Sequence, residues 1–350
     1  MPGKPLSHDL EEIIAFHESV VAEGRKALIG YEREKLLANV VLLSEIPTTY
    51  DERSERQVNS GNLLLQGVPG VGKTFFGVII AAISNAKFAR IQGRPDLQPN
   101  EIVGFQRINP ATGEITTEFG PIASGEVILL DEISRIPPKS QSGFLEALQD
   151  RTITIGKETY DLPQFSFAIA TMNPVEIGQG TFPLSEAATD RFAMIININY
   201  LPPDEEQKLV QFNFKKVKLD KIMPKERIIE LRGKVNEEVR LHPKLDKYIR
   251  RLVCASRPFN KEKWPYYSPS ELAERFVELG ASPRATICWG RLAKTWALLH
   301  GRRQEVYPED IQNLSRYVLG HRVWLKPDAS SEGVAVENVI DQIIEKVPIP

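Results

Sequence analysis

Residues 67–74 form a candidate phosphate-binding loop. They read Gly67-Val68-Pro69-Gly70-Val71-Gly72-Lys73-Thr74 and match the pattern G-x-x-x-x-G-K-[ST]. Glycine lets backbone N–H groups curl around phosphate oxygens, and the helix that follows adds partial positive charge at its N-terminus. Lys73 is expected to reach the β- and γ-phosphates, and the Thr74 hydroxyl to ligate Mg²⁺. The loop, together with the adjoining Phe75, therefore predicts a site for ATP or GTP.

The segments on either side of the loop favour a nucleotide site over a glycine-rich surface turn. Residues 62–66 are a short apolar run typical of a buried strand, and residues 75–84 continue as an apolar, helix-like segment. A surface turn would need neither this strand nor the Lys-Thr pair. We therefore expect a strand, the loop and a helix in that order.

Length and composition indicate a globular chain. Its 350 residues suggest two domains, and 42% hydrophobic residues are enough for a packed core. No apolar run is long enough to span a membrane, and the N-terminus lacks the apolar stretch of a secretory signal. The two cysteines, Cys254 and Cys288, suit neither a disulfide framework nor a thiolate metal site, which favours a reducing, cytoplasmic setting. A net charge of −2 argues against general binding of polyanions.

Strand-like and helix-like segments alternate through the first two hundred residues, after a helical segment from His8 to Gly24. This alternation predicts an α/β domain over residues 1–200. Most of the strand candidates are continuous apolar runs, which suits a five-stranded parallel sheet covered on both faces. They are residues 62–66, 87–92, 126–131, 165–171 and 194–199.

The second half of the chain is predicted to be helical. Leu201-Pro202-Pro203-Asp204 breaks the alternating pattern, and almost every later segment has helical periodicity, so residues 201–350 are expected to form an all-α domain. Ser282 and Pro283 suit the start of a helix that ends at Gly301. Residues 326–333 have the composition of a polar linker. Apolar residues then recur at helical spacing from 336 to 347, which predicts a last helix packed on the body.

Two carboxylates follow a buried-strand candidate, at Asp131 and Glu132 after the run Val127-Ile128-Leu129-Leu130. Beside a phosphate loop, Asp131 would position the metal and its water shell, and Glu132 would act as the general base that polarises the attacking water. An ordinary strand followed by acidic loop residues is the alternative. The phosphate loop upstream favours the catalytic interpretation.

Asn173 ends the next strand candidate, in Ala170-Thr171-Met172-Asn173-Pro174. Its side-chain amide both donates and accepts hydrogen bonds, so it could orient water against the γ-phosphate. Asn-Pro is also a common turn dipeptide. Its position after the Asp131-Glu132 strand favours the functional role.

Together, these motifs give a chain that resembles the MoxR family of AAA+ ATPases over nearly its whole length. The resemblance implies an AAA+ P-loop core in residues 1–200 and a C-terminal all-α lid in residues 201–350. Besides the two nucleotide motifs, the segments that carry it are Gly120-Pro121-Ile122, Leu130 to Lys139, Phe144 to Arg151, Ala170 to Pro174, Thr181 to Ala187, Asp190-Arg191-Phe192 and Gly280 to Ala285.

The resemblance implies roles that spacing alone does not assign. Asn173 becomes sensor 1, Arg191 an arginine finger supplied to a neighbouring subunit, and Arg284 sensor 2 in the lid. Arginine suits both latter roles, because its planar, permanent charge neutralises a transferring phosphoryl group. The alternatives are a solvated or salt-bridged Arg191, and an Arg284 that is only a helix N-terminal residue. A cation at a helix start is locally unfavourable, which favours a phosphate partner for Arg284.

The resemblance also implies two insertions in the core. Residues 101–119 would be a hairpin that interrupts a helix, with its turn at residues 109–113. Residues 151–161 alternate apolar and polar side chains around Gly156-Lys157, which predicts a second hairpin independently. Such hairpins would face a ring pore or a partner, or would merely complete the edge of the fold.

The resemblance implies a homo-oligomeric ring, expected to be a hexamer, that hydrolyses ATP with Mg²⁺ and remodels or matures a client enzyme together with a von Willebrand type A domain protein. A ring motor stimulated by nucleic acid is the alternative, since residues 215–234 hold eight basic side chains. That stretch lacks interleaved aromatic residues and reads more as a solvated face. A nucleotide-gated binding module without turnover is a third possibility, which Glu132, Asn173 and Arg191 argue against.

Overall fold

A five-stranded parallel sheet forms the centre of the N-terminal half. The computed structural model describes residues 5–51, 56–59, 61–174, 180–213, 217–258 and 269–350, with the side chains of 48–51 and 56–59 excepted. The strand order is β11-β3-β10-β7-β4, and all neighbouring pairs are parallel. The strands are β3 (Leu63–Gly67), β4 (Phe88–Gln92), β7 (Val127–Asp131), β10 (Phe167–Met172) and β11 (Met194–Ile198). The predicted sheet is confirmed, with strand bounds within two residues of those expected.

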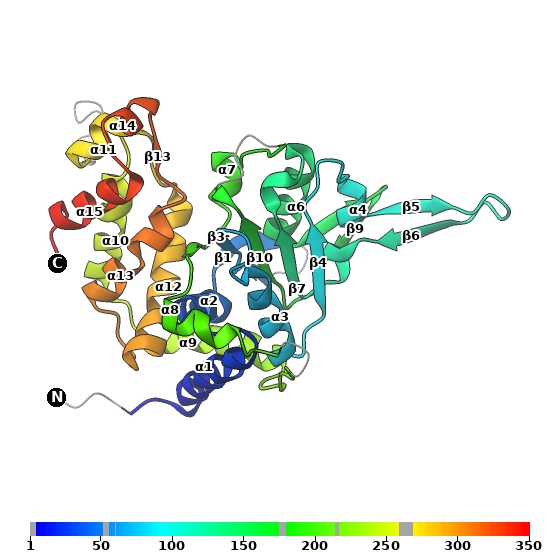
Figure 1. Ribbon diagram of the computed structural model, residues 1–350, viewed down its shortest axis with the longest axis horizontal. Helices are drawn as coiled ribbons and strands as arrows, with labels where there is room; N and C mark the ends of the chain where they lie inside the picture. The colour runs from blue at the N-terminus through cyan, green and yellow to red at the C-terminus, as the bar shows by residue number, and fades with distance from the viewer. Residues whose placement is uncertain (1–4, 52–55, 60, 175–179, 214–216, 259–268) are drawn as a thin grey trace.

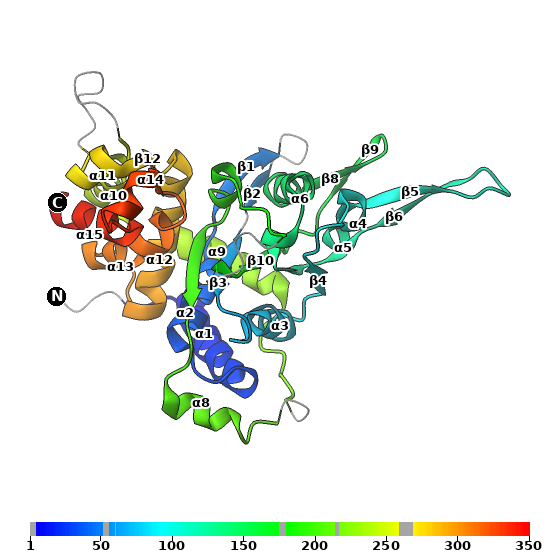
Figure 2. The same ribbon diagram turned by 45° about the horizontal axis from the view of Figure 1, so that its top comes forward.

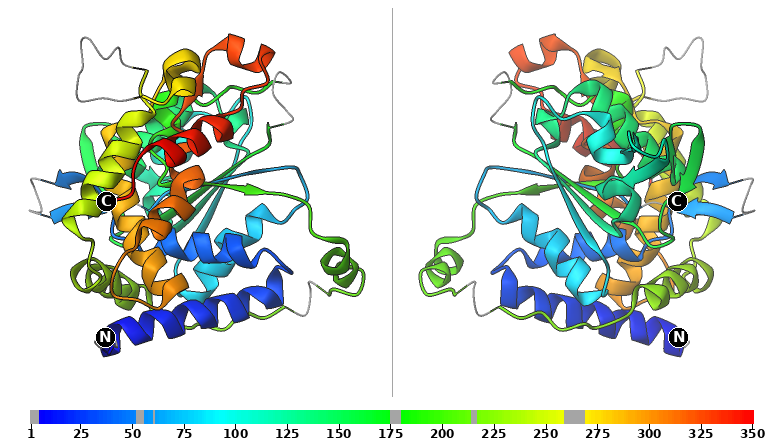
Figure 3. Two further views of the ribbon diagram at one scale, coloured as in Figure 1. Left: turned by 90° about the vertical axis from the view of Figure 1, so that its left-hand side faces the viewer. Right: turned by 90° about the vertical axis from the view of Figure 1, so that its right-hand side faces the viewer.

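The sheet is apolar on both faces because helices cover both. Along β7, Val127 and Leu129 join one core cluster, whereas Ile128 and Leu130 join the other. Figure 3 shows α1 (His8–Ala27), α2 (Glu32–Leu43) and α3 (Lys73–Ile83) on one side of the sheet, and α6 (Pro138–Asp150) on the other. Successive strand residues point to opposite faces of the sheet. Because helices bury both faces, a central strand such as β7 is apolar at every position from Val127 to Leu130.

A helical region forms the C-terminal part, as predicted, and packs beside the N-terminal helices (Figure 1). The Ser282 hydroxyl accepts a hydrogen bond from the Arg284 N–H and caps α12, so the predicted helix from Pro283 to Gly301 is confirmed. The helices of the second half are α8 (Pro203–Leu209), α9 (Lys225–Glu238), α10 (Pro243–Ala255), α11 (Glu271–Phe276), α12 (Pro283–Gly301), α13 (Pro308–Leu319), α14 (Pro327–Ser331) and α15 (Val336–Lys346).

Two details of this region differ from the sequence-based expectation. The segment predicted as a polar linker contains α14, because Pro327 suits the first turn and Ala329 is fully buried. A short antiparallel ladder joins β12 (Val277–Leu279) to β13 (Trp324–Leu325) within the otherwise helical region. The predicted last helix is present as α15 and buries Val339, Ile340 and Ile343 against the body.

Three hairpins extend from the N-terminal half (Figure 2). They are β1–β2 (Pro47–Asp51 and Arg56–Asn59), β5–β6 (Gly104–Ile108 and Ile115–Phe119) and β8–β9 (Thr152–Ile155 and Glu158–Asp161). The long β5–β6 hairpin leaves the body between the short helices α4 (Pro99–Val103) and α5 (Pro121–Ser124). The β8–β9 hairpin braces its base, since the Tyr160 ring lies 4.9 Å from the Phe119 ring in an edge-to-face contact.

Among the described residues, no helix is both long enough and apolar enough to cross a membrane. Two further short elements in the described part of the chain are the 3-10 turn η1 (Ile133–Arg135), which follows Glu132, and α7 (Glu186–Thr189), which precedes Asp190.

Candidate functional site

The phosphate loop lies between the end of β3 at Gly67 and the start of α3 at Lys73. Gly70 and Gly72 have φ angles of 85° and 83°, in the left-handed region that glycine tolerates best. A Cβ on Gly72 would also lie 2.7 Å from Leu28 Cδ1. Lys73 Nζ donates to Gly67 O over 2.7 Å and to Val68 O over 2.8 Å, so its ammonium group lies within the curl of the loop.

Asp131 and Thr74, the two predicted metal-ligating residues, lie next to each other. Thr74 Oγ1 is 3.5 Å from Asp131 Oδ2. Asp131 also accepts a hydrogen bond from Thr171 Oγ1 over 2.7 Å and pairs with Arg90 Nη2 at 2.5 Å. A hydroxyl and a carboxylate oxygen are the hard ligands that Mg²⁺ prefers, so this pair fits the metal that accompanies a bound nucleoside triphosphate.

Glu132, the predicted general base, sits on a strained turn directly after β7. Its φ and ψ are 57° and 53°, an uncommon conformation for a residue with a side chain. Its backbone N–H donates to Thr171 Oγ1 over 3.0 Å. The carboxylate accepts from Gln92 Nε2 over 3.2 Å and pairs with Arg135 Nε at 3.2 Å. These contacts hold a half-exposed carboxylate at the carboxyl ends of the strands, where the phosphate loop also lies.

Asn173 also lies at the carboxyl ends of the strands. It follows Met172, whose Cα partner on β3 is Gln66, one residue before the loop. Asn173 is buried, which suits a side chain held in one orientation. The structure therefore brings together four of the predicted groups, which are the loop, Asp131, Glu132 and Asn173.

Arg191 lies near the amino ends of the strands, opposite the ends that carry the phosphate loop. It precedes β11, whose first residue Met194 pairs with Leu63, whereas the last, Ile198, pairs with Gly67. From Met194 to Ile198, β11 rises four times about 3.3 Å, roughly 13 Å in all, along the direction of the strand. Arg191 precedes Met194 and therefore lies beyond the end of β11 that is remote from the loop. The structure therefore separates Arg191 from the phosphate loop of its own chain.

Arg284 lies beside Arg191 instead of beside the loop. Gln149 Oε1, at the end of α6, accepts hydrogen bonds from Arg191 Nε over 2.9 Å and from Arg284 Nη2 over 3.2 Å. Arg191 Nη1 also donates to Ala187 O over 2.6 Å. The two predicted arginines are far apart in the sequence. They thus form one group near the ends of the strands that are remote from the loop.

Asp190 joins this group to the helical region. Its carboxylate accepts from Ser282 Oγ over 2.8 and 2.9 Å and from Arg322 Nε over 3.0 Å, and it pairs with Arg284 Nη1 at 3.4 Å. Arg322 is buried and donates further to Val318 O over 2.6 Å. Sequence reasoning assigned no role to Asp190, Gln149 or Arg322, although the first two fall within segments that carry the family resemblance.

A cavity of about 230 Å³ adjoins the phosphate loop and suits the base of a nucleotide, because its wall is mostly apolar. Phe75, one of the predicted nucleotide-binding residues, forms part of this wall. Tyr31 Oη in the wall donates to Asn199 O over 2.9 Å. Sequence reasoning missed most of the lining, since it comes from the α1–α2 turn and from α8, which carry no motif. The lining residues are Ala27, Leu28, Ile29, Tyr31, Pro69, Gly70, Val71, Gly72, Phe75, Tyr200, Leu201, Glu206 and Leu209.

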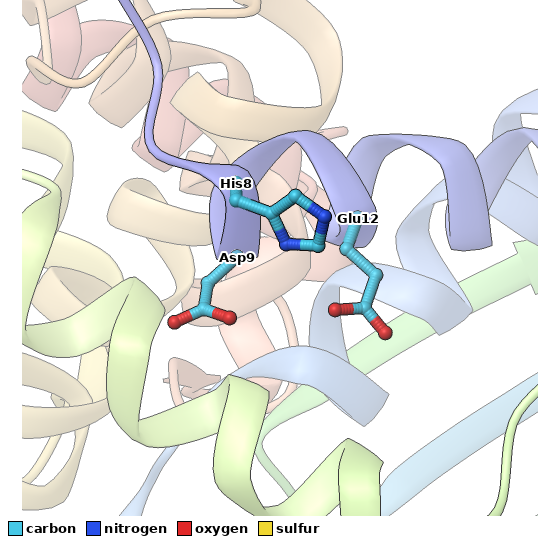
Figure 4. Close-up of side chains that lie close together, drawn as sticks. All are labelled: His8, Asp9 and Glu12. Atoms are coloured by element: carbon cyan, nitrogen blue, oxygen red, sulfur yellow. The ribbon is translucent and has the colours of Figure 1, made fainter.

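His8, Asp9 and Glu12 cluster on the first turn of α1, with ligand atoms within 4.8 Å of one another (Figure 4). The Arg227 guanidinium pairs with Asp9 Oδ1 at 2.5 Å and with Glu12 Oε2 at 2.6 Å. Because an arginine already balances these carboxylates, we interpret the cluster as a salt bridge between α1 and α9.

The basic stretch of residues 215–234 is largely occupied within the molecule. Besides Arg227, Lys225 pairs with Glu126, Lys234 pairs with Glu237 at 3.1 Å, and buried Arg232 donates to Leu42 O over 2.5 Å. Lys215 and Lys216 lie outside the described residues. These internal pairs leave fewer cations for the phosphates of a nucleic acid.

Comparison with known proteins agrees with this geometry. Residues 62–194 match the ATPase family associated with various cellular activities (AAA), and residues 270–344 match the AAA lid domain. A crystal structure of a protein from Cytophaga hutchinsonii, described as a candidate ATPase, superposes with a TM-score of 0.78 at 32% identity over 97% of each chain. The fold and the loop define an AAA+ ATPase.

Two sequence relatives narrow the class to a family. The uncharacterized protein YeaC of Bacillus subtilis is 37% identical over 83% of this chain and 86% of its own length. The chaperone MoxR1 of Mycobacterium tuberculosis is 34% identical over 84% of this chain and 75% of its own. The chain belongs to the MoxR family of AAA+ ATPases.

Proposed function

We propose that this chain is the subunit of a ring, a hexamer in the simplest case, that hydrolyses ATP with Mg²⁺ at sites shared between neighbouring subunits and uses the energy to remodel or mature a client protein. The observation that supports it most is the separation of two groups in one chain. The nucleotide loop, Asp131 and Glu132 lie at the carboxyl ends of the strands, and Arg191 and Arg284 lie at the opposite ends.

One subunit supplies the nucleotide-binding half of the site. Residues 67–75 would enclose the phosphates, and Thr74 and Asp131 would hold Mg²⁺, which neutralises charge on the β- and γ-phosphates. Glu132 would take the proton of the attacking water, for which its outward carboxylate is suited. Asn173 is buried at the same ends of the strands and would orient that water.

The neighbouring subunit supplies the arginines. Within one chain, Arg191 lies near the ends of the strands opposite the loop, and Arg284 lies beside it, which supports a role for both at the neighbouring subunit's γ-phosphate instead of their own. In a head-to-tail ring, the surface that carries Arg191 and Arg284 would meet the surface of the next subunit that carries its loop. Both arginines would then act in trans, and hydrolysis would require assembly.

The chaperone role follows from the family. The relative from Mycobacterium tuberculosis is named a chaperone. We extend that role to this chain, with a client enzyme and a von Willebrand type A domain protein as partners. A cytoplasmic location belongs to the same proposal and is supported by Cys254 and Cys288, both of which are buried free thiols.

ATP turnover as a function of protein concentration tests the shared site. The rate per subunit should be near background when the protein is dilute, and should rise with the assembled fraction measured by analytical ultracentrifugation under the same conditions. An ATPase rate per subunit that stays constant while the protein dissociates to monomers would contradict the proposal.

Polynucleotide stimulation tests the alternative of a nucleic-acid motor. We expect DNA and RNA to leave the ATPase rate unchanged, because the basic stretch is engaged in internal pairs and the chain is net acidic. A motor that follows phosphates would instead show strong stimulation that falls by orders of magnitude between about 50 and 200 mM salt.

A further inference from the structure

We infer that Gln149 is a positioning residue that holds Arg191 and Arg284 together as one unit, ready for the γ-phosphate of the neighbouring subunit. This inference rests on the proposed trans role of the two arginines. It assigns to a neutral side chain control over the geometry of both cations.

The geometry is specific. One atom, Gln149 Oε1, accepts from Arg191 Nε over 2.9 Å and from Arg284 Nη2 over 3.2 Å. Arg191 belongs to the loop before β11, whereas Arg284 belongs to the first turn of α12 in the helical region. Gln149 therefore bridges two parts of the chain that could otherwise orient their arginines independently.

A glutamine suits this task for a chemical reason. Two neighbouring guanidinium groups repel each other because both are positively charged, and neither can accept a hydrogen bond from the other, so a shared acceptor holds them together. The amide oxygen provides that acceptor without a negative charge. The contact with Gln149 therefore neutralises neither arginine, and the charge of Arg191 in particular stays available for a phosphate.

The surrounding contacts show why Gln149 matters more to Arg191 than to Arg284. Arg284 has a second anchor in Asp190, whose carboxylate also accepts from Ser282 and Arg322. The other described contact of Arg191 is with Ala187 O, four residues earlier in its own segment. Without Gln149, the orientation of Arg191 would depend on that local segment.

Two variants separate the hydrogen bond from the bulk of the side chain. Gln149→Met keeps the length but removes the acceptor, so we expect the turnover number of the assembled protein to fall roughly tenfold to a hundredfold, the loss expected for hydrogen bonds to charged groups. The Kd for ATP and the assembled fraction should stay unchanged. Gln149→Glu keeps an acceptor oxygen but adds a negative charge that would neutralise the arginines, so we expect its turnover to fall as well, and wild-type turnover in this variant would contradict the need for a neutral acceptor.

A double-mutant comparison tests whether Gln149 acts through the arginines. In an Arg191→Ala background, Gln149→Met should lower turnover by less than twofold further, because the group it positions is already absent. Full additivity of the two losses, or wild-type turnover in Gln149→Met, would overturn the inference.

The outcome also distinguishes this inference from the proposed function. If Arg191→Ala and Arg284→Ala themselves retain wild-type turnover, the arginine assignment fails. If both arginine variants are inactive while Gln149→Met is fully active, only the role of Gln149 fails. Thermal unfolding of each variant identifies a loss that comes from misfolding, and the double-mutant comparison in the Arg191→Ala background then decides the question in a folded protein.

Discussion

Thr171 Oγ1 donates a hydrogen bond to Asp131 Oδ1 over 2.7 Å, and the same oxygen accepts the backbone N–H of Glu132 over 3.0 Å. One buried hydroxyl on β10 therefore fixes both acidic residues at the end of β7. It orients the carboxylate that would hold the metal and stabilises the left-handed backbone that aims the general base.

Replacing this hydroxyl should impair catalysis more than folding. We expect Thr171→Val to reduce the turnover number roughly tenfold or more and to raise the Mg²⁺ concentration for half-maximal rate, because a lost hydrogen bond to a charged group costs about 1.5–3 kcal/mol. Thr171→Ser keeps the hydroxyl and serves as the control. Steady-state phosphate release across a Mg²⁺ titration measures both effects, and a Thr171→Val enzyme indistinguishable from Thr171→Ser would refute the role of this contact.

Binding and turnover should separate between two variants at the loop. Lys73→Ala removes the ammonium group held within the loop and should abolish ATP binding. Glu132→Gln keeps that group and should bind ATP normally but stop hydrolysis, because the amide cannot take a proton from water. Equilibrium binding of labelled ATP together with phosphate release tests the pair. Wild-type turnover in Glu132→Gln would eliminate Glu132 as the base.

Acidification should destabilise the fold through His17. Burial lowers the pKa of His17 from 6.5 to about 4, with a smaller opposing effect of Glu18 and a lowering effect of Arg302. The unfolded chain thus binds a proton more tightly than the folded one, so the free energy of unfolding should fall as pH drops from about 6.5 towards 4. Urea unfolding at pH 7 and pH 5 should show a smaller loss for His17→Gln than for the wild type. Equal losses in the two proteins would argue against this contribution.

The sequence predicted most of the sheet because buried parallel strands have a strong local signal. Continuous apolar runs located most of the five strands, and the carboxyl ends of the strands brought Asp131, Glu132 and Asn173 to the loop. The ladder of β12 and β13 was not predicted, since its strands are two or three residues long and pair Val277 with Leu325 across the whole of α12 and α13. Such pairing depends on tertiary packing and leaves no period in the sequence.

Two parts of the candidate site were also not predictable from motifs in the sequence. A motif identifies residues that act on the phosphates, whereas the base cavity is lined by the α1–α2 turn and α8, whose apolar residues look like any other core positions. The position of Arg284 relative to the loop also needed the fold. Arg284 contacts Gln149 at the ends of the strands remote from the loop, which no spacing between the two residues could predict, and this contact supports the proposed trans role.

Mixing two inactive variants tests the shared site most directly. Lys73→Ala has an intact arginine finger but no working loop, and Arg191→Ala has the reverse. In a randomly mixed head-to-tail ring, about a quarter of the interfaces would join an intact loop to an intact finger, so turnover should recover towards about a quarter of the wild-type rate. Recovery on mixing, with each variant inactive alone, is expected of a site shared between subunits. No recovery despite verified co-assembly would contradict it and would confine Arg191 to a role within its own subunit.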